Sequence, residues 1–327
     1  MIKIGNIIFE KKPLLLAPME DVSDPPFRYL CKQYGADIMF TEFIASEGLI
    51  RDAKKSIKKL QLTDYERPIA IQIFGNKISS MVEAAKIAEQ ANPDFIDINY
   101  GCPVKKIAMK GSGAGMLKDI DFMVEMTSEI VKAVNLPVTV KTRLGWDNSK
   151  KNIVEIAERL QDVGIAAITI HGRTRTQMYK GEADWTLIGE VKNNQRMKIP
   201  VFGNGDVDSP EKAKLMYDKY GVDGIMIGRA CVGKPWLFNQ IKQYLDNGEL
   251  IPEPRLKEKV EMVKTHFEKS LEWKGLPTGI FEMRRQFANY FKGLPNFKTT
   301  RLKLLTSEDT DEIINILDTI AINYKDY

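Results

Sequence analysis

Some features are scarce in this sequence, and each scarcity excludes a class of protein. The 327 residues include two histidines and three cysteines, and no apolar run reaches the roughly 18 residues of a membrane span. Two histidines are too few for a His-rich metal centre. Three cysteines without close pair spacing exclude a disulfide framework or a cysteine-rich zinc site. We therefore expect a cytoplasmic protein without a membrane segment or a bound metal.

The chain also lacks a large excess of charge of either sign. It carries 48 Lys and Arg against 44 Asp and Glu, a formal net charge of +4. Any argument for nucleic acid must therefore rest on local basic clusters and not on the whole chain. With 43% hydrophobic residues, the chain is long enough for one large domain and a smaller one.

Short, β-branched apolar runs recur through the first three-quarters of the chain and alternate with stretches of helical spacing. The predicted strands cover residues 14–17, 38–41, 69–73, 95–99, 138–141, 167–171, 201–203 and 224–227. The predicted helices between them include residues 78–90, 123–134, 153–163 and 211–220. Such alternation predicts parallel βαβ units, and eight units within ~250 residues match a closed β/α barrel.

Polar residues follow these runs at the carboxyl end of each one. They are Pro18-Met19, Glu42, Gln72, Asn99, Lys141, His171, Asn204-Gly205-Asp206 and Gly228-Arg229. A doubly wound open sheet is the structural alternative, but the carboxyl ends of barrel strands converge on one mouth. The fold class we predict is therefore α/β, a parallel (β/α)8 TIM barrel, with an all-α helical domain at the C-terminus.

The pattern changes after Trp236. Residues 244–254 are rich in turn formers, and no strand-like run follows them. Residues 256–273, 281–291 and 310–322 have apolar residues at helical spacing. We predict a catalytic barrel at 1–243, a linker at 244–254 and a helical domain at 255–327.

The string IDINYGCP at residues 96–103 ends a predicted buried strand with a turn through Gly101 that presents Cys102 at the mouth. Free cysteines are often small apolar fillers, and we interpret Cys31 and Cys231 in that way. The position of Cys102 favours a functional role instead. Its thiol could act as a nucleophile or as an acid, and the residues alone do not choose between them.

Two further strand ends place polar groups at the mouth. Lys141 could form a Schiff base, bind phosphate or stabilise a negatively charged reduced flavin. His171 opens the string HGRTR, which brings Arg173 and Arg175 beside it. His266 lies at apolar spacing in the helical tail, where a core role is favoured.

The last two strand ends, Asn204-Gly205-Asp206 and Gly228-Arg229, combine glycines with an arginine. Glycines let backbone N–H groups approach a ligand, and arginine binds phosphate in a bidentate manner. The loops after strands seven and eight are the usual phosphate site of these barrels. A phosphate-bearing cofactor is therefore predicted here, and FMN fits best.

An ordered set of strings between residues 13 and 236 supports a more specific interpretation. The strings are APM at 17–19, DPPFR at 24–28, Gln72, NYGCP at 99–103, KTR at 141–143, HGRTR at 171–175, NGD at 204–206 and Gly228-Arg229. Together they resemble the tRNA-dihydrouridine synthase family, and within it the bacterial B-type branch.

The resemblance implies a set of cofactor contacts. They are Pro18, Met19, Gln72, Lys141, His171, Asn204, Gly205, Asp206, Gly228 and Arg229, all holding FMN. We add Glu20, whose carboxylate would lie near the flavin edge. The resemblance also implies that NADPH (or NADH) reduces the FMN, that a flipped-out uracil of tRNA accepts hydride at carbon 6, and that Cys102 protonates carbon 5. Asn99 would contact the uracil, with Arg173 as a second substrate contact.

The helical tail resembles the RNA-binding domain of that family in length and position. Residues 274–303 hold seven Lys or Arg against one acid, Glu282. Basic groups suit phosphates and exposed rings suit bases, although most of the aromatic rings here are expected in a core. The expected RNA contacts are Arg284, Arg285, Lys292, Lys298 and Arg301. We expect a monomer.

Two rival functions stay open. One is a flavin barrel that acts on a small pyrimidine or enone and needs no basic helical tail. The other is an RNA-binding protein whose barrel has lost catalysis, against which the presence of Cys102, Lys141 and His171 argues. A basic helical tail separates the synthase from the first rival.

Overall fold

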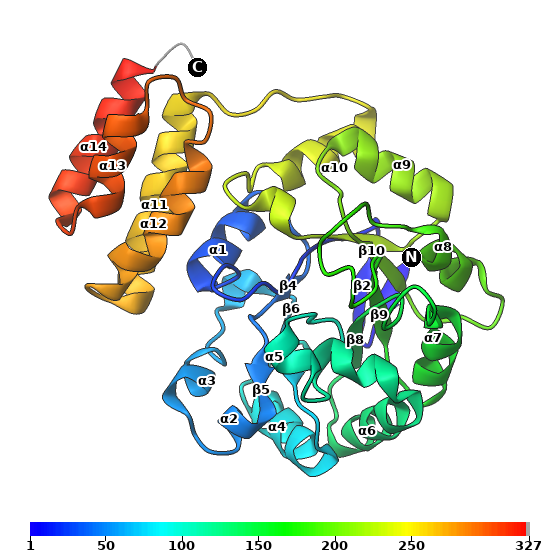
Figure 1. The fold of residues 1–327 in the computed structure, drawn as a ribbon. Coiled ribbons are helices and arrows are strands. Elements are labelled where there is room, and N and C mark those ends of the chain that lie inside the picture. The colour runs from blue at the N-terminus through cyan, green and yellow to red at the C-terminus, as the bar shows by residue number, and fades with distance from the viewer. Residues whose placement is uncertain (325–327) are drawn as a thin grey trace.

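Eight parallel strands close into a barrel in the computed structural model, which describes residues 1–324 (Figure 1). The barrel strands are β3 (Leu14–Leu16), β4 (Met39–Phe40), β6 (Ile69–Phe74), β7 (Phe95–Asn99), β8 (Val138–Arg143), β9 (Ala167–His171), β10 (Val201–Asn204) and β11 (Gly224–Ile227). Their order around the sheet is β3-β11-β10-β9-β8-β7-β6-β4. The predicted α/β barrel is confirmed.

The barrel closes between its first two strands. Leu15 forms a parallel bridge with Ile38, just before β4, and the Leu16 N–H donates to the Ile38 carbonyl at 3.0 Å. Strand β5 (Ile44–Ala45) pairs with the end of β6. The strands read as nearly continuous apolar runs because both faces of a parallel barrel sheet are covered.

Helices surround the barrel because each buries one apolar stripe on it. In α7 (Ile153–Asp162) the buried residues are Ile153, Ile156, Ala157 and Leu160, one side of the helix. The others are α1 (Pro25–Gln33), α4 (Ile78–Gln90), α6 (Ile120–Ala133), α8 (Thr186–Asn193), α9 (Pro210–Tyr220) and α10 (Leu237–Asn247). Shorter pieces in the loops are α2 (Ser46–Leu49), α3 (Lys54–Lys58), α5 (Lys105–Ala108), η1 (Asp64–Glu66), η2 (Gly113–Lys118) and η3 (Arg229–Cys231).

An antiparallel hairpin precedes the barrel, and the sequence analysis did not predict it. It consists of β1 (Ile2–Ile4) and β2 (Ile7–Phe9). Ile4 is buried in a cluster with Phe95 and Ala167, the first residues of β7 and β9. The hairpin therefore covers the amino-terminal end of the barrel and leaves the carboxyl ends of the strands open.

The tail forms four helices within residues 256–323, where three were predicted. They are α11 (Leu256–Lys274), α12 (Thr278–Tyr290), α13 (Lys298–Thr306) and α14 (Thr310–Asn323). Helix α13 was missed because it buries only Leu304 and so has little helical periodicity. Helix α10 extends to Asn247, four residues into the segment predicted as linker, and ends at Gly248 with φ +75°.

The helical tail lies against α1 of the barrel through α11, with α13 and α14 on the side away from the barrel (Figure 1). Leu30 of α1 and Trp236 belong to the same buried cluster as Phe267 and Phe287. At one end of this contact, the Lys274 ammonium pairs with Asp24 and with Glu282. Among residues 1–324, none of the helices has both the length and the apolar character that crossing a membrane requires.

Candidate active site

A cavity of about 470 Å³ opens where the carboxyl ends of the barrel strands meet. Eleven of the residues predicted for the site line it: Pro18, Met19, Asn99, Cys102, Lys141, His171, Asn204, Gly205, Asp206, Gly228 and Arg229. Of the others in the barrel, Glu20, Gln72 and Arg173 are not among its lining residues. The structure thus brings together residues that lie up to 211 positions apart in the sequence.

Cys102 is held at the cavity from both sides of its peptide backbone. Its N–H donates to the Asn99 side-chain oxygen at 2.8 Å, and its carbonyl accepts from the Ala114 N–H at 3.1 Å. Gly113 has φ +55°, and a side chain there would meet Cys102 at 3.1 Å. Burial raises the pKa of the Cys102 thiol, and Arg143 only partly offsets this. The thiol is therefore protonated at neutral pH.

Lys141 reaches the cavity from β8 and is held by Asn204. The ammonium donates to Asn204 Oδ1 at 3.2 Å, and Asn204 Nδ2 donates to the Met226 carbonyl at 2.8 Å. Because a carbonyl can only accept, Asn204 must turn its own oxygen to Lys141. Burial, with Arg143 nearby, lowers the pKa of Lys141 to about 8. A buried ammonium of this kind suits an anionic ligand.

His171 has a defined tautomer because of its neighbour Arg173. The Arg173 guanidinium lies 3.3 Å from His171 Nε2. Since arginine can only donate, Nε2 must accept and the proton sits on Nδ1. Burial and several nearby arginines and lysines lower the pKa of His171 well below its usual range, so the ring is neutral. A neutral His171 can therefore only donate a hydrogen bond through Nδ1.

Arg173 itself is buried and is engaged inside the protein. It pairs with Asp206 at 2.5 Å and donates to the carbonyls of Lys180 and Gly181. These bonds tie the loop after β9 to the loop after β10. The structure gives Arg173 a place in orienting His171 and Asp206, and no contact with the cavity.

Gln72 is fully buried beneath the cavity. Its amide nitrogen donates to Asp97 at 2.5 Å, and its oxygen accepts from Asn99 at 2.8 Å. Its amide is thus turned toward two neighbouring polar side chains of β7. The flavin contact that the family resemblance implies for Gln72 stays a prediction.

Asn99 has a limited capacity to bind a ligand. Its oxygen accepts from the N–H groups of Gly101 and Cys102, at 2.9 and 2.8 Å, and one of its two N–H bonds is given to Gln72. Both lone pairs of the oxygen are thereby used. The side chain can offer the cavity only its second N–H, so Asn99 acts there as a donor.

Arg143, Tyr179 and Phe43 also line the cavity, although they were not among the predicted site residues. Arg143 donates to the carbonyls of Gly101 at 2.7 Å and Thr174 at 3.0 Å, which joins the loops after β7 and β9. The Tyr179 ring stacks on the guanidinium of Arg229 at 4.7 Å. Arg143 could have been predicted from the sequence, because it is the third residue of the KTR string. Tyr179 lies in a loop without periodicity and could not have been predicted in this way.

One end of the cavity suits a phosphate. Gly205 has φ +125°, and a side chain at Gly228 would contact Ala17 and Met19. Arg229 and Lys212 line the same region, where Arg229 pairs with Asp206 at 3.3 Å and Lys212 with Asp208 at 3.8 Å. Asp206 is bound more closely by Arg173, which leaves Arg229 able to turn to a phosphate. A ring system with carbonyl oxygens would meet donors at Lys141 and His171. The residues present therefore fit a flavin mononucleotide.

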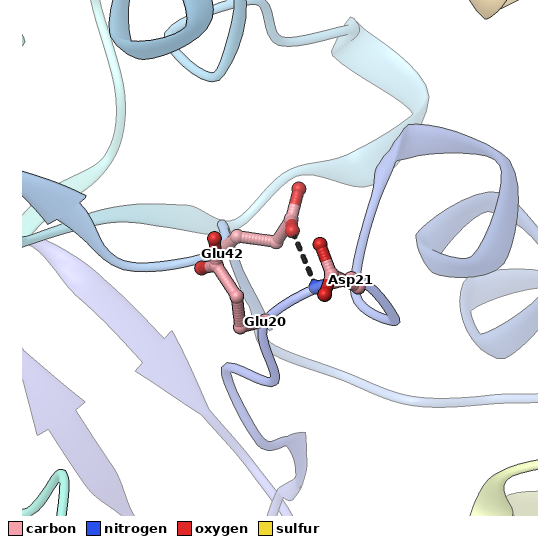
Figure 2. A group of neighbouring side chains, drawn as sticks. All are labelled: Glu20, Asp21 and Glu42. Carbon is pink, nitrogen blue, oxygen red and sulfur yellow. Dashed lines mark hydrogen bonds between the residues drawn. The ribbon is translucent and has the colours of Figure 1, made fainter. Parts of the chain in front are cut away.

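Glu20 lies apart from the cavity lining. Its carboxylate, with those of Asp21 and Glu42, forms a group whose oxygens lie within 4.8 Å of one another (Figure 2). Lys59 already supplies a cation to this group, with its ammonium 2.6 Å from Glu20 and 3.6 Å from Glu42. The Asp21 N–H donates to Glu42 at 2.7 Å. These contacts brace the loop after β3, and Glu20 is bound within them.

The predicted RNA contacts divide into two groups in the helical part. Arg284 is half-buried, donates to the carbonyls of Thr306 and Ser307, and packs on Phe281. Lys292, Lys298 and Arg301 instead line a second cavity of about 480 Å³ between α12 and α13. No acidic residue lines it, and within residues 1–324 none of these three cations has an ion pair. Arg285 is exposed and does not line it.

A comparison with known protein families decides the affiliation. A family model described as dihydrouridine synthase matches residues 15–324. The chain belongs to the dihydrouridine synthase family. Its relatives include a probable tRNA-dihydrouridine synthase of Rickettsia conorii, 41% identical over 90% of this chain and 89% of that protein. The tRNA-dihydrouridine synthase B of Pseudomonas putida is 39% identical over 94% of this chain and 91% of that protein.

Solved structures share the barrel of this dihydrouridine synthase family member at much lower identity. Histamine dehydrogenase from Rhizobium sp. 4-9 has a TM-score of 0.56 and 13% identity, and covers 82% of this chain and 50% of that chain. A 2-naphthoyl-CoA reductase complex has a TM-score of 0.59 and 13% identity, over 74% of this chain and 51% of that chain. This chain thus spans about half the length of these structures. The likeness shows the fold alone.

Proposed function

We propose that this chain reduces a uridine of tRNA to 5,6-dihydrouridine. Membership of the dihydrouridine synthase family and the names of relatives that match along nearly their whole length support the reaction. The observation that carries the proposal is the protonated thiol of Cys102, held at a cavity where Asn99, Lys141 and His171 offer hydrogen-bond donors.

The cofactor we propose is FMN, with NADPH or NADH as the reductant. Reduced flavin supplies the hydride when it is bound. Gly205, Gly228 and Arg229 would hold the phosphate, while Lys141 and His171 would bind the oxygens and nitrogens of the ring. Pro18 and Met19 would pack beside the ring.

Cys102 would donate the proton. Addition of hydride at carbon 6 of uracil leaves negative charge that is relieved by a proton at carbon 5. The raised pKa of Cys102 keeps the proton on sulfur until that charge develops. Asn99 and Arg143 would meet the carbonyl oxygens of the uracil as donors. A base cannot reach such a cavity while it is stacked in a helix, so the uridine must be flipped out.

The helical part would bind the rest of the tRNA. Lys292, Lys298 and Arg301 surround a cavity without acids and suit backbone phosphates. Arg285 stays a candidate contact, and Arg284 would act through the orientation of the loop after α13. We assign catalysis to residues 1–243 and RNA binding to residues 255–327. A monomer acting in the cytoplasm, where tRNA and nicotinamide nucleotides are present, would suffice for this reaction.

The test is dihydrouridine formation in unmodified tRNA incubated with the purified protein, FMN and NADPH, measured by mass spectrometry. Cys102→Ala should retain bound flavin and lose a factor of about 10²–10⁴ in turnover, the usual contribution of a general acid. Cys31→Ala removes a buried thiol that does not line the cavity and serves as the control. Bound flavin without any reduction of RNA would instead support a small-molecule oxidoreductase. Turnover near wild type in Cys102→Ala would remove Cys102 from the mechanism.

A further inference from the structure

Asp97 is a buried carboxylate that does not reach the cavity. It lies on β7, is 1% exposed, and accepts two hydrogen bonds. Thr139 Oγ1 donates to Asp97 Oδ1 at 2.5 Å, and Gln72 Nε2 donates to Asp97 Oδ2 at 2.5 Å. Burial raises the pKa of Asp97 to about 6. At pH 7 the group is therefore mainly ionised, and an ionised carboxylate can only accept.

That property fixes the direction of every bond that follows. Gln72 must give its NH₂ group to Asp97, so its oxygen is left to face Asn99. Asn99 must then give an N–H to Gln72, so its own oxygen faces the N–H groups of Gly101 and Cys102. A side-chain amide by itself has two orientations that exchange donor for acceptor. Here the charge on Asp97 at one end and the two backbone N–H groups at the other leave one orientation for both amides.

We propose that Asp97 is a positioning residue for Cys102, acting through Gln72 and Asn99. The bonds run from Asp97 on β7 to Gln72 on β6, return to Asn99 at the end of β7, and end at the Cys102 N–H. If Gln72 turned over, its NH₂ group would face that of Asn99, and if Asn99 turned over with it, the N–H groups of Gly101 and Cys102 would face an NH₂ group. Leaving such buried groups unpaired costs about 1–3 kcal/mol each. The turn that presents the thiol therefore depends on a carboxylate that lies three hydrogen bonds away from the Cys102 N–H.

The proposal is tested by moving the carboxylate from position 97 to position 72, one step along this series of hydrogen bonds. In Gln72→Glu, two carboxyl groups face each other at positions 72 and 97. When both are ionised, two acceptors meet and the series breaks, whereas sharing one proton would restore it, so this variant is measured from pH 7 to pH 10. In Asp97→Asn, residue 97 can donate or accept, so only the N–H groups of Gly101 and Cys102, acting through Asn99, still favour the original orientation of Gln72. In the double variant Gln72→Glu/Asp97→Asn, the new glutamate accepts from both residue 97 and Asn99. Asn99 then keeps its original orientation, and Thr139 still has an acceptor.

The first readout is the rate at which iodoacetamide alkylates Cys102, identified by peptide mass spectrometry. Cys102 is 7% exposed while Cys31 and Cys231 are fully buried, so Cys102 reacts first. We expect a rise of about ten- to a hundredfold in Gln72→Glu, a smaller rise in Asp97→Asn, and a rate near wild type in the double variant. A double variant that reacts as fast as Gln72→Glu, or faster, would overturn the proposal.

The matched control is Asp223→Asn. Asp223 also accepts a partly buried hydrogen bond, from the Val201 N–H at 2.8 Å, but it lies at the amino-terminal end of the barrel. We expect this variant to lower the melting temperature without changing the Cys102 alkylation rate. An equal rise in alkylation for Asp223→Asn would assign the effect to general loosening and contradict a positioning role.

The second readout rests on the proposed function. Turnover of tRNA uridine should fall about ten- to a hundredfold in kcat for Gln72→Glu, with KM for tRNA unchanged, and should recover in the double variant. If the wild-type protein forms no dihydrouridine, the proposed function fails. The alkylation series still decides the role of Asp97 in that case, because it requires no turnover.

Discussion

At the scale of single residues, the mouth of the barrel holds ordinary side chains whose properties are changed by their neighbours. Burial raises the pKa of Cys102 and so keeps its thiol protonated. Burial and cationic neighbours lower the pKa values of His171 and Lys141. The arginine beside His171 decides which ring nitrogen donates. The mouth therefore presents hydrogen-bond donors at Asn99, Lys141 and His171. In other surroundings each of these side chains could also act as an acceptor, lysine when it is neutral.

Lys141 leads to a prediction about pH. Because its pKa is lowered to about 8, the ammonium form is lost as pH rises through that value. If the ammonium binds the flavin, the affinity of the flavin-free protein for FMN should fall between pH 7 and pH 9, by up to about tenfold per unit above the pKa. Quenching of FMN fluorescence would measure this.

Lys141→Arg provides the control because arginine keeps its charge throughout this range. The Arg variant should bind FMN with an affinity that changes little from pH 7 to pH 9, and Lys141→Met should bind weakly at every pH. A wild-type affinity that is constant over the same range would argue against contact between the Lys141 ammonium and the flavin.

At the scale of elements, the contact between α1 and α11 joins the barrel to the helical tail. His266 of α11 is fully buried there, with its ring against Phe27 of α1 and its Nδ1 2.9 Å from the Tyr290 hydroxyl. Burial lowers the pKa of His266 to about 4. These surroundings agree with the prediction that His266 is a core residue.

His266 should make the docking of α11 sensitive to acid. Its pKa in the unfolded chain is about 6.5, so below that value the unfolded state takes up a proton that the folded state refuses until about pH 4. Stability is therefore lost as pH falls from about 6.5 to about 4. The contribution between pH 7 and pH 5 is about 2 kcal/mol.

Urea unfolding at pH 7 and pH 5 would measure this loss. His266→Gln retains a polar group for Tyr290 and does not titrate, so it should lose about 2 kcal/mol less than wild type over the same interval. Carboxylates titrate equally in both proteins and cancel in the comparison. Equal losses in the two proteins would contradict the burial of a neutral His266.

At the scale of the whole molecule, two cavities face different parts of one proposed substrate. Gly233 lies four residues after Arg229, which lines the active-site cavity. It packs against Asn289, which lines the second cavity between α12 and α13, called here the basic cavity. The loop after β11 therefore connects the two. A net charge of +4 is too small to hold RNA broadly, so binding should depend on the local cations.

Lys298→Gln/Arg301→Gln should weaken tRNA binding without disturbing the active site. Each lost phosphate contact lowers the slope of log Kd against log salt by roughly 0.7–0.9. The double variant should therefore lower the slope by about 1.5 and raise KM for tRNA, with kcat and bound flavin unchanged. Fluorescence anisotropy of labelled tRNA across a salt series measures the slope.

Lys303→Gln is the matched control, because Lys303 is an exposed lysine of the same helix that does not line the basic cavity. It should leave the slope nearly unchanged. If the control and the double variant change the slope per removed charge equally, the cavity has no special part in RNA binding.

The barrel and most of the residues at its mouth can be predicted from the amino-acid pattern alone. Eight apolar runs are local patterns, and parallel strands that alternate with helices must end on one side. Polar residues after those runs, such as Asn99, Lys141 and His171, could therefore be placed together without a structure. The helical tail was predictable for the same reason, except α13, whose single buried residue gives no period.

The direction in which each polar side chain turns depends on the folded chain. Gln72 meets Asp97, Glu20 meets Lys59, and Arg173 meets Asp206, across 25, 39 and 33 residues. No local period encodes such a meeting, because it depends on the register of neighbouring strands and on the paths of the loops above them. The same is true of the protonation of Cys102 and the tautomer of His171, since both are set by groups that are distant in sequence and close in space.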